Sequence, residues 1–219
     1  MKLSDTKKLI LVSCILIVGA GIAAVIYQIQ QTKVPAMVGI NLREELVRPD
    51  SHAQGPENAP LTVVEFLDPE CESCMAFYPI MKSFLDENQG KVRFVVRYMA
   101  FHVSSEMAVA ALESAALQGK YWEYLETLFT MAGEWGHRPQ PEIGFFEKYA
   151  EGHGLDLVRF RSDMQNPKWK ALVERDMKDG QTMGVRGTPT VFLNGEMLDG
   201  LDSTSLRFAS RRHLGNLQK

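Results

Sequence analysis

Cys71 and Cys74, separated by two residues, have the spacing in this chain that most directly predicts chemistry. A short apolar run, 61–67, precedes them and a segment with helical character, 75–85, follows, so Cys71 is expected where a helix begins. Unpaired backbone N–H groups and the helix dipole stabilise a thiolate there and lower its pKa. Cys74 lies one helical turn further on, within reach of a disulfide of ordinary geometry. The pair is therefore predicted to cycle between dithiol and disulfide.

A Cys-x-x-Cys pair is also half of a four-ligand zinc site, which needs a second pair of cysteines or histidines. The third cysteine, Cys14, lies far away in an apolar run, and the five histidines are scattered. A copper- or zinc-binding or delivery module, with His102 as third ligand, is the alternative to redox chemistry. A non-catalytic adaptor is less consistent with the sequence, since it has no need of two thiols. Thiol exchange itself requires no cofactor and no metal.

The composition suits one domain behind an apolar N-terminal segment. The chain has 219 residues, a formal net charge of −3 and 45% hydrophobic residues, which fits a single domain with an insertion. A charge balance so close to neutral gives no reason to expect nucleic acid as a partner.

The N-terminal segment predicts a membrane anchor. Leu9–Tyr27 is a run of 19 residues without a charge, preceded by Lys2, Lys7 and Lys8. As a helix it would be about 28 Å long, close to the hydrocarbon thickness of a bilayer. The lysines favour keeping residues 1–8 in the cytoplasm. We therefore predict a single-pass signal anchor over residues 9–27 in a bacterial inner membrane, with the catalytic domain on the periplasmic side.

Two alternatives for this segment stay open. The small-residue stretch Gly19–Ala24 is compatible with a cleaved signal peptide, and Leu11–Cys14 resembles a bacterial lipobox, which would lipidate Cys14. All three interpretations place the cysteine pair outside the cytosol, where disulfides persist.

The order of segments after the anchor predicts a tether and then an α/β domain. Residues 28–58 are polar, contain three prolines and lack a sustained period, as is typical of a tether. The domain is expected over 59–216, beginning with a buried strand at 61–67. A helix containing Pro79 and a second apolar strand at 91–99 follow. Strand, helix and strand in this order indicate a parallel pair.

A helical insertion is predicted at about 104–183, with Ser104 or Ser105 as its first N-cap and a loop at 133–141. Its helices are expected at 107–117, 121–131, 143–150, 157–164 and 168–183.

The last part of the chain predicts a hairpin and a closing helix. Strand 190–193 is followed by Asn194-Gly195, the preferred two-residue turn, and the helix at 201–214 has Asp202 or Ser203 as its cap.

Glu65 interrupts the apolar strand at 61–67 and allows two interpretations. It is either an edge residue that faces solvent or a buried carboxylate beneath Cys74. Burial would raise the pKa of Glu65 and let it relay the proton of Cys74 during exchange.

From about residue 55 to 214 the chain resembles the DsbA-like extracytoplasmic branch of the thioredoxin-fold family. The features that carry this resemblance are Val64-Glu65-Phe66, the Cys71–Cys74 pair, Pro79, Gln118–Trp122 within the insertion, and Gly187-Thr188-Pro189-Thr190 before a hairpin. The resemblance implies an α/β thioredoxin fold with a helical insertion, here preceded by one transmembrane helix.

The resemblance also implies a role for each matching residue. Cys71 would attack and form the mixed disulfide, and Cys74 would resolve it. Pro189 would be the cis-proline opposite the redox-active disulfide Cys71–Cys74, with Thr188 before it contacting substrate backbone. Glu65 would match the buried carboxylate of the family.

The activity implied is that of a protein thiol:disulfide oxidoreductase that forms, isomerises or reduces disulfides in secreted or envelope proteins. Its partners would be extracytoplasmic proteins that contain cysteine and a membrane or soluble redox partner that recycles the pair. The membrane would be a further partner, bound through the N-terminal helix.

The chain departs from this branch between its cysteines, where Glu72-Ser73 replaces a Pro-His whose imidazole helps to stabilise the thiolate. Glu70 and Glu72 would oppose a thiolate on Cys71 if they pointed toward it. A higher thiolate pKa predicts a couple less oxidising than DsbA. The threonine before the cis-proline also resembles the residue at this position in the isomerase branch, so the direction of exchange stays open.

Overall fold

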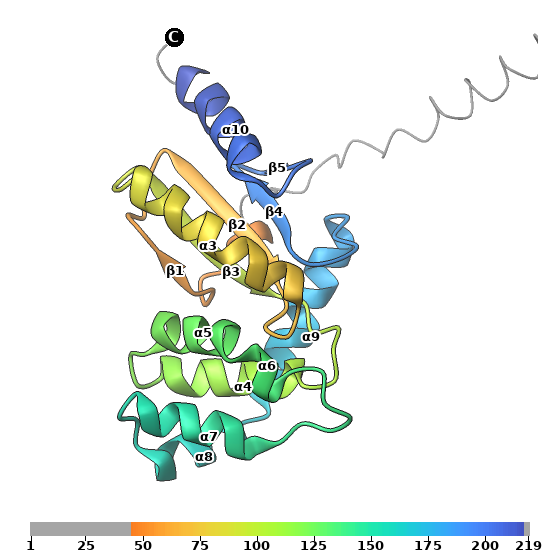
Figure 1. Ribbon diagram of the computed structural model, residues 1–219. Coiled ribbons are helices and arrows are strands. Elements are labelled where there is room, and N and C mark those ends of the chain that lie inside the picture. Colours follow the sequence, from red (N-terminus) through yellow and green to blue (C-terminus); the bar gives the residue numbers. More distant parts are fainter. Residues whose placement is uncertain (1–44, 217–219) are drawn as a thin grey trace, which may run out of the picture. The chain divides into compact units, whose positions relative to one another are not determined.

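The computed structural model describes residues 45–216, and these build an α/β domain on a five-stranded sheet (Figure 1). Its strands are β1 Ala53–Gln54, β2 Leu61–Leu67, β3 Val92–Tyr98, β4 Thr190–Leu193 and β5 Glu196–Met197. They lie in the order β1-β3-β2-β4-β5, with β2 and β3 parallel and the other neighbours antiparallel. The predicted parallel pair is therefore confirmed, and β2 is the central strand.

Helices cover both faces of the sheet. α3 Glu72–Glu87 connects β2 to β3 and covers one face together with α10 Ser203–Asn216, whereas α9 Lys168–Thr182 lies against the other (Figure 1). α9 approaches closely because position 180 is glycine. A Cβ there would lie 2.8 Å from the Met99 sulfur and 3.2 Å from the Phe66 ring.

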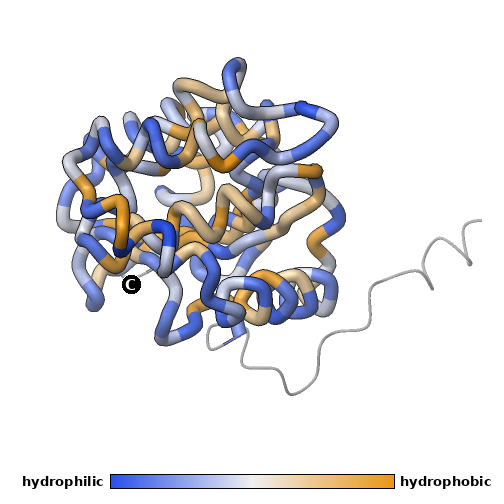
Figure 2. Tube along the Cα trace, turned by 90° about the horizontal axis from the view of Figure 1, so that it is seen from below, coloured by the Kyte–Doolittle hydropathy of each residue, from blue (hydrophilic) through white to orange (hydrophobic). Residues whose placement is uncertain are grey.

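The predicted helical insertion is present between β3 and β4. Besides α9 it contains α4 Ser105–Ala116, α5 Tyr121–Thr130, α6 Ala132–Trp135, α7 Ile143–Gly152 and α8 Leu157–Met164. Helices α4–α8 pack side by side next to the sheet, with hydrophilic stretches at the outer loops (Figures 1 and 2).

Three local predictions can be compared with the structure. The loop expected at 133–141 begins with the last turn of α6. Ser104 stands at the N-cap of α4, but its side chain makes no capping bond. The predicted cap of α10 is confirmed, since Oδ1 of Asp202 accepts the N–H of Ser205 at 2.8 Å.

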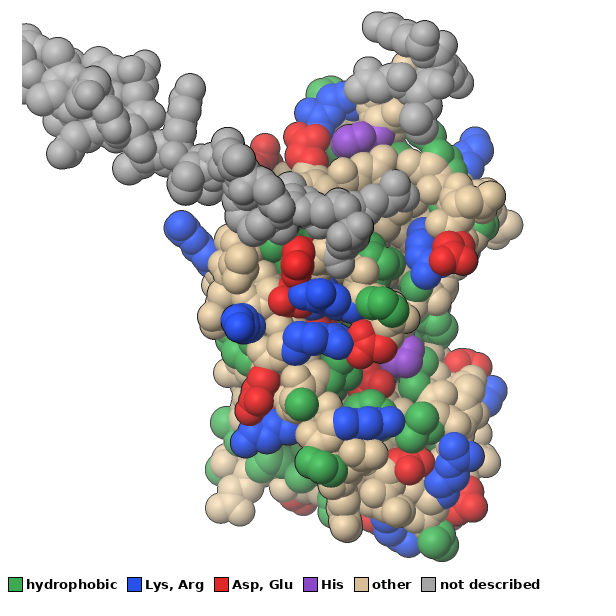
Figure 3. Space-filling view, turned by 180° about the vertical axis from the view of Figure 1, so that it is seen from behind, with side chains coloured by type: hydrophobic (Ala, Val, Ile, Leu, Met, Phe, Trp, Pro, Cys, Tyr) green, Lys and Arg blue, Asp and Glu red, His purple; other side chains and the backbone are tan. Residues whose placement is uncertain are grey.

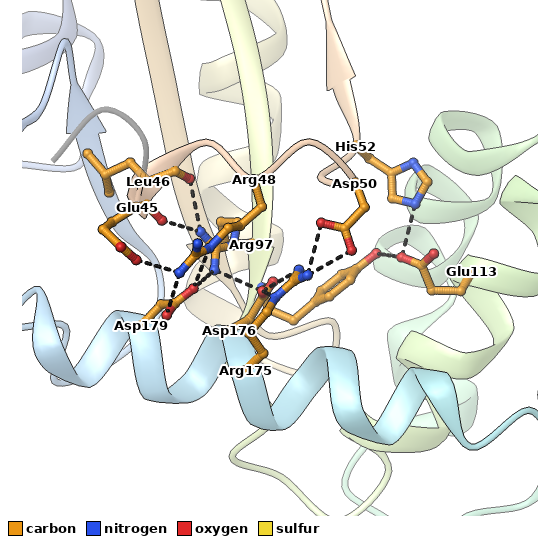
Figure 4. Close-up of polar contacts among 11 residues, drawn as sticks. Glu45, Leu46, Arg48, Asp50, His52, Arg97, Glu113, Arg175, Asp176 and Asp179 are labelled. Atoms are coloured by element: carbon orange, nitrogen blue, oxygen red, sulfur yellow. Dashed lines mark hydrogen bonds and ion pairs between the residues drawn. The ribbon is translucent and has the colours of Figure 1, made fainter. Parts of the chain in front are cut away.

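The predicted tether is wrong from residue 45 onward, because this part of the chain packs on the domain. β1 pairs with β3 and extends the sheet. Arg97, which is fully buried, donates to the carbonyls of Glu45 and Leu46 at 2.7 and 3.1 Å (Figure 4). Arg97 also binds Asp176 at 2.9 Å and Asp179 at 2.5 Å.

The ion cluster around Arg97 extends to the surface through two further arginines. Arg48 binds Asp179 at 3.0 Å, and Arg175 binds Asp50 at 2.8 Å (Figure 4). On the face of the domain seen from behind, acidic and basic side chains are intermixed (Figure 3). The domain thus begins at or before residue 45 and not at residue 59.

Within residues 45–216 no helix combines the length and the apolar composition that crossing a membrane requires. The predicted cytoplasmic residues 1–8, the anchor at 9–27 and Cys14 lie outside the described residues.

Replacing Arg97 with methionine should lower the free energy of unfolding by about 3 kcal/mol, measured by urea denaturation. The change leaves the buried Asp176 and the partly buried Asp179 with fewer cations, and breaking a buried ion pair costs about 3–5 kcal/mol. Because Arg48 and Arg175 remain, we expect the lower end. The control R207M breaks a solvent-exposed pair with Glu87 and should cost much less, because water and salt screen such a pair. Equal losses in the two variants would contradict the importance of Arg97.

Candidate active site

The two cysteines lie where the sequence predicts, at the start of α3. Cys71 is the N-cap residue and is 8% exposed, whereas Cys74 is fully buried, and both are free thiols. The Cys71 sulfur lies 3.4 Å from the carbonyl oxygen of Thr188. The Thr188–Pro189 peptide bond is cis, as the resemblance implies. The fold therefore brings the loop before β4 against the cysteine pair, 117 residues away along the chain.

The two thiols differ strongly in acidity. A hydrogen bond from Cys74 lowers the pKa of Cys71 to about 5, against the opposing effect of burial, with help from Thr188 and the N–H groups of Ser73 and Cys74. Burial, together with the bond to Cys71 and the charge of Glu65, raises the pKa of Cys74 well above its usual value. Cys71 is therefore the more acidic of the two thiols, which is the property a nucleophilic cysteine requires near neutral pH.

Glu65 is a buried carboxylate, so the interpretation that it faces solvent is wrong. It is 1% exposed and lies in the centre of the sheet, opposite Val96 on β3 and Val191 on β4. Burial, with a contribution from the charge of Cys71, raises the pKa of Glu65 to about 8. No described residue donates a hydrogen bond to its Oε2. These properties fit a group that exchanges a proton with Cys74.

The expectation that Glu70 and Glu72 raise the pKa of Cys71 is wrong. Glu70 is fully buried, and its two oxygens accept the backbone N–H groups of Ser104 and His137, both at 2.6 Å. Glu72 has a largely exposed side chain and pairs with Nε2 of His137 at 3.0 Å. Because both carboxylates bind elsewhere, the physical basis for a couple less oxidising than DsbA is not found in the structure.

Asp68 is a site residue that the sequence analysis missed. Its buried carboxylate accepts the N–H groups of Glu70 and Phe101 at 2.9 and 2.8 Å. It also accepts the Ser105 hydroxyl at 2.5 Å and lies 2.7 Å from Nδ1 of His102. The available signal was an aspartate at the end of a buried strand, which the sequence presents only as a turn residue before proline.

The metal hypothesis finds no additional ligand set in the described part of the chain. No group of three or more histidine, cysteine, aspartate or glutamate side chains within residues 45–216 has the geometry to hold a metal ion. The proposed third ligand, His102, has its Nδ1 engaged with Asp68.

Known proteins similar to this chain have the same fold. A family model described as thioredoxin matches residues 48–207. A thioredoxin-like oxidoreductase from Silicibacter pomeroyi DSS-3 is 26% identical, with a TM-score of 0.67 over 78% of this chain and 96% of that chain. BdbD from Bacillus subtilis is 25% identical, with a TM-score of 0.64 over 75% and 93%. Wolbachia pipientis alpha-DsbA1 is 15% identical, with a TM-score of 0.73 over 81% and 97%, and supports the fold alone.

Curated relatives include proteins named Na(+)/H(+) antiporter NhaA. That of Herminiimonas arsenicoxydans is 36% identical over 167 residues, which cover 74% of this chain and 26% of that protein. The chain thus spans about a quarter of the length of the curated relatives it matches.

Replacing Glu65 with glutamine should stabilise the reduced protein relative to wild type as the pH rises from about 5 to about 8. With a folded pKa of about 8 and a reference value of 4.5, folded Glu65 keeps a proton that the unfolded chain releases. Its contribution to stability is present below the reference value and is lost as the pH rises through the folded value. At about 1.4 kcal/mol per pKa unit, the relative gain of E65Q is roughly 3–5 kcal/mol.

Denaturant unfolding of both proteins across this pH range measures the difference. The titration of Cys71 also changes stability with pH, but it does so in both proteins and largely cancels in the difference. Parallel stability profiles for wild type and E65Q would show that Glu65 does not titrate as a buried acid.

Proposed function

The chain belongs to the thioredoxin family, as a DsbA-like thiol:disulfide oxidoreductase, and we propose that it forms, isomerises or reduces disulfides in secreted or envelope proteins. The observation that carries this proposal is the geometry at Cys71. An acidic thiol stands at the start of α3 against the cis Thr188–Pro189 bond, with Cys74 one turn behind it.

When the pair donates its disulfide, a substrate thiolate attacks the Cys71 sulfur. The bond between Cys71 and Cys74 breaks, a mixed disulfide forms between the substrate and Cys71, and Cys74 leaves. A second substrate thiolate then attacks the substrate sulfur of the mixed disulfide and releases Cys71 as a thiolate. The substrate loses two electrons and the pair gains them, so a redox partner must oxidise the pair again.

In the reverse direction Cys71 attacks a substrate disulfide and Cys74 resolves the mixed disulfide. Cys74 must lose its proton first, and burial opposes this. The Glu65 carboxylate, whose pKa is about 8, is the base we propose for this proton. Thr188 would present its backbone to the substrate segment that flanks the attacked cysteine.

We propose disulfide donation as the direction favoured by the site. Oxidising power follows the stability of the reduced form, and a thiol of low pKa is also a good leaving group. The hydrogen bonds that stabilise the Cys71 thiolate support this direction.

We further propose that the domain works on the extracytoplasmic side of a bacterial inner membrane, held there by residues 9–27. The apolar run in the sequence supports this. The matched segments in proteins named as antiporters are consistent with a domain of this kind on a membrane protein. We propose no ion transport for this chain, since the match covers 26% of that relative.

Two cysteine variants test the proposed roles. Cys71→Ser should abolish both the reduction of insulin and the oxidation of reduced substrate proteins. Cys74→Ser should accumulate mixed disulfides, visible when gels with and without reductant are compared, because nothing resolves them. C14S is the matched control and should retain both activities. A Cys74 variant that traps no partner would show that the two roles are assigned wrongly.

The redox state in the cell tests the direction. Thiol alkylation in intact cells should find Cys71 and Cys74 mainly as a disulfide if the protein donates disulfides. A mainly reduced pair would instead indicate an isomerase or a reductase.

A further inference from the structure

Two histidines from outside the Cys-x-x-Cys motif contact residues within it or close to it in sequence, His102 at Asp68 and His137 at Glu72. His102 is in the loop between β3 and α4, and His137 follows α6. Their rings are nearly perpendicular, with centroids 5.5 Å apart. The two side chains are 33% and 46% exposed, so both imidazoles can exchange protons with solvent.

Asp68 fixes the position of His102 relative to Cys71. Its Oδ2 lies 2.7 Å from Nδ1 of His102 and also accepts the N–H of Phe101 at 2.8 Å. Its Oδ1 accepts the Ser105 hydroxyl at 2.5 Å, so the buried carboxylate is bound on both sides. The backbone carbonyl of Asp68 accepts the N–H of Cys71 at 3.1 Å. One residue thus holds both the imidazole and the start of α3.

Glu70 ties the loops of both histidines to the same place. Its oxygens accept the N–H groups of Ser104 and His137, both at 2.6 Å. The ring of His137 is in addition paired with Glu72 at 3.0 Å. His137 therefore has its own carboxylate partner, whereas His102 shares Asp68 with three other donors.

The charged and titratable groups that face His102 come from three segments. The turn after β2 supplies Asp68 and Glu70, the start of α3 supplies Cys71, and the loop after α6 supplies His137. Partial burial opposes the charged imidazole. The hydrogen bond to Asp68 and the charges of Asp68, Cys71 and Glu70 outweigh it and raise the pKa of His102 above its usual value.

We propose that the His102 imidazolium, held by Asp68, stabilises the Cys71 thiolate from outside the Cys-x-x-Cys motif and couples the redox equilibrium of the pair to protonation of the imidazole. The inference rests on the proposed thiol:disulfide function. His102 is a positioning residue in this scheme, because it acts through its charge on Cys71 and not on the substrate.

The proton balance makes the coupling measurable. Reduction of the disulfide takes up two electrons and leaves the Cys71 thiolate and the Cys74 thiol, which has gained one proton. The new negative charge increases the affinity of His102 for a proton, so a second proton is bound where the imidazole titrates. By reciprocity, the imidazolium favours the thiolate by the same factor. For opposite charges near a partly exposed site this factor is about ten.

The test compares purified full-length wild type with His102→Asn, whose side-chain N–H group can replace Nδ1 toward Asp68. In the reduced proteins the ultraviolet absorbance of the thiolate gives the pKa of Cys71, which should rise by about one pH unit in H102N. The equilibrium constant for reduction by glutathione should fall about five- to tenfold near pH 6 and match wild type near pH 9, where both lack the charge.

Two further variants separate charge from structure. H102K keeps a cation and should match wild type near pH 6. H153N removes a histidine that contacts Thr127 on α5 and should match wild type at both pH values. An unchanged Cys71 pKa in H102N, or an equal loss near both pH values, would overturn the proposal.

If H102N does not fold, nuclear magnetic resonance of wild type decides the question. The pKa of His102 should be higher in the reduced than in the oxidised protein, and equal values would overturn the proposal. None of the titrations requires turnover. A wild type that fails to exchange disulfides with insulin would therefore refute the proposed function and leave the coupling separately testable.

Discussion

Four hydrogen bonds converge on the buried carboxylate of Asp68, and the geometry of the site depends on them. They join the turn between the central strand and Cys71 to the residues 101–105, which lie 33–37 positions further along the chain. If this segment moved away, the buried carboxylate would lose these donors and keep its desolvation cost. This cost stabilises the segment in its observed position. Glu70 extends the same constraint to the loop of His137. The mouth of the site is thus organised by two acids that do not react.

The end of β3 is held in place by contacts on both faces of the sheet. Arg97 and Tyr98 are adjacent on β3, so their side chains point to opposite faces. Arg97 binds the acids of α9, and the hydroxyl of Tyr98 donates to Glu113 on α4 at 2.7 Å. The backbone N–H of Tyr98 donates to Asp176 at 3.1 Å. The end of β3, from which the His102 loop departs, is therefore anchored to both α4 and α9.

Local pattern was sufficient to predict most of the fold. Apolar runs and turn residues located β2 and β4 at their observed bounds, and Cys71 at the start of α3. The residues at 45–54 were predicted as tether because they are polar. Their partners are distant, as in the bond between Arg48 and Asp179, 131 positions apart. A pairing of that separation leaves no local signal, so no period in the sequence indicates it.

The cysteine pair shows the same limit for charge. Glu70 and Glu72 flank Cys71 in sequence, and counting charges along the chain predicts a thiol of raised pKa. In the fold Glu70 turns toward two backbone N–H groups, whose dipoles satisfy its charge, and Glu72 points to solvent and His137. Cys71 meets donors instead, foremost the Cys74 thiol, and its pKa falls to about 5. What decides the chemistry of the sulfur is which groups point at it, and a sequence gives the identity of neighbours without their direction.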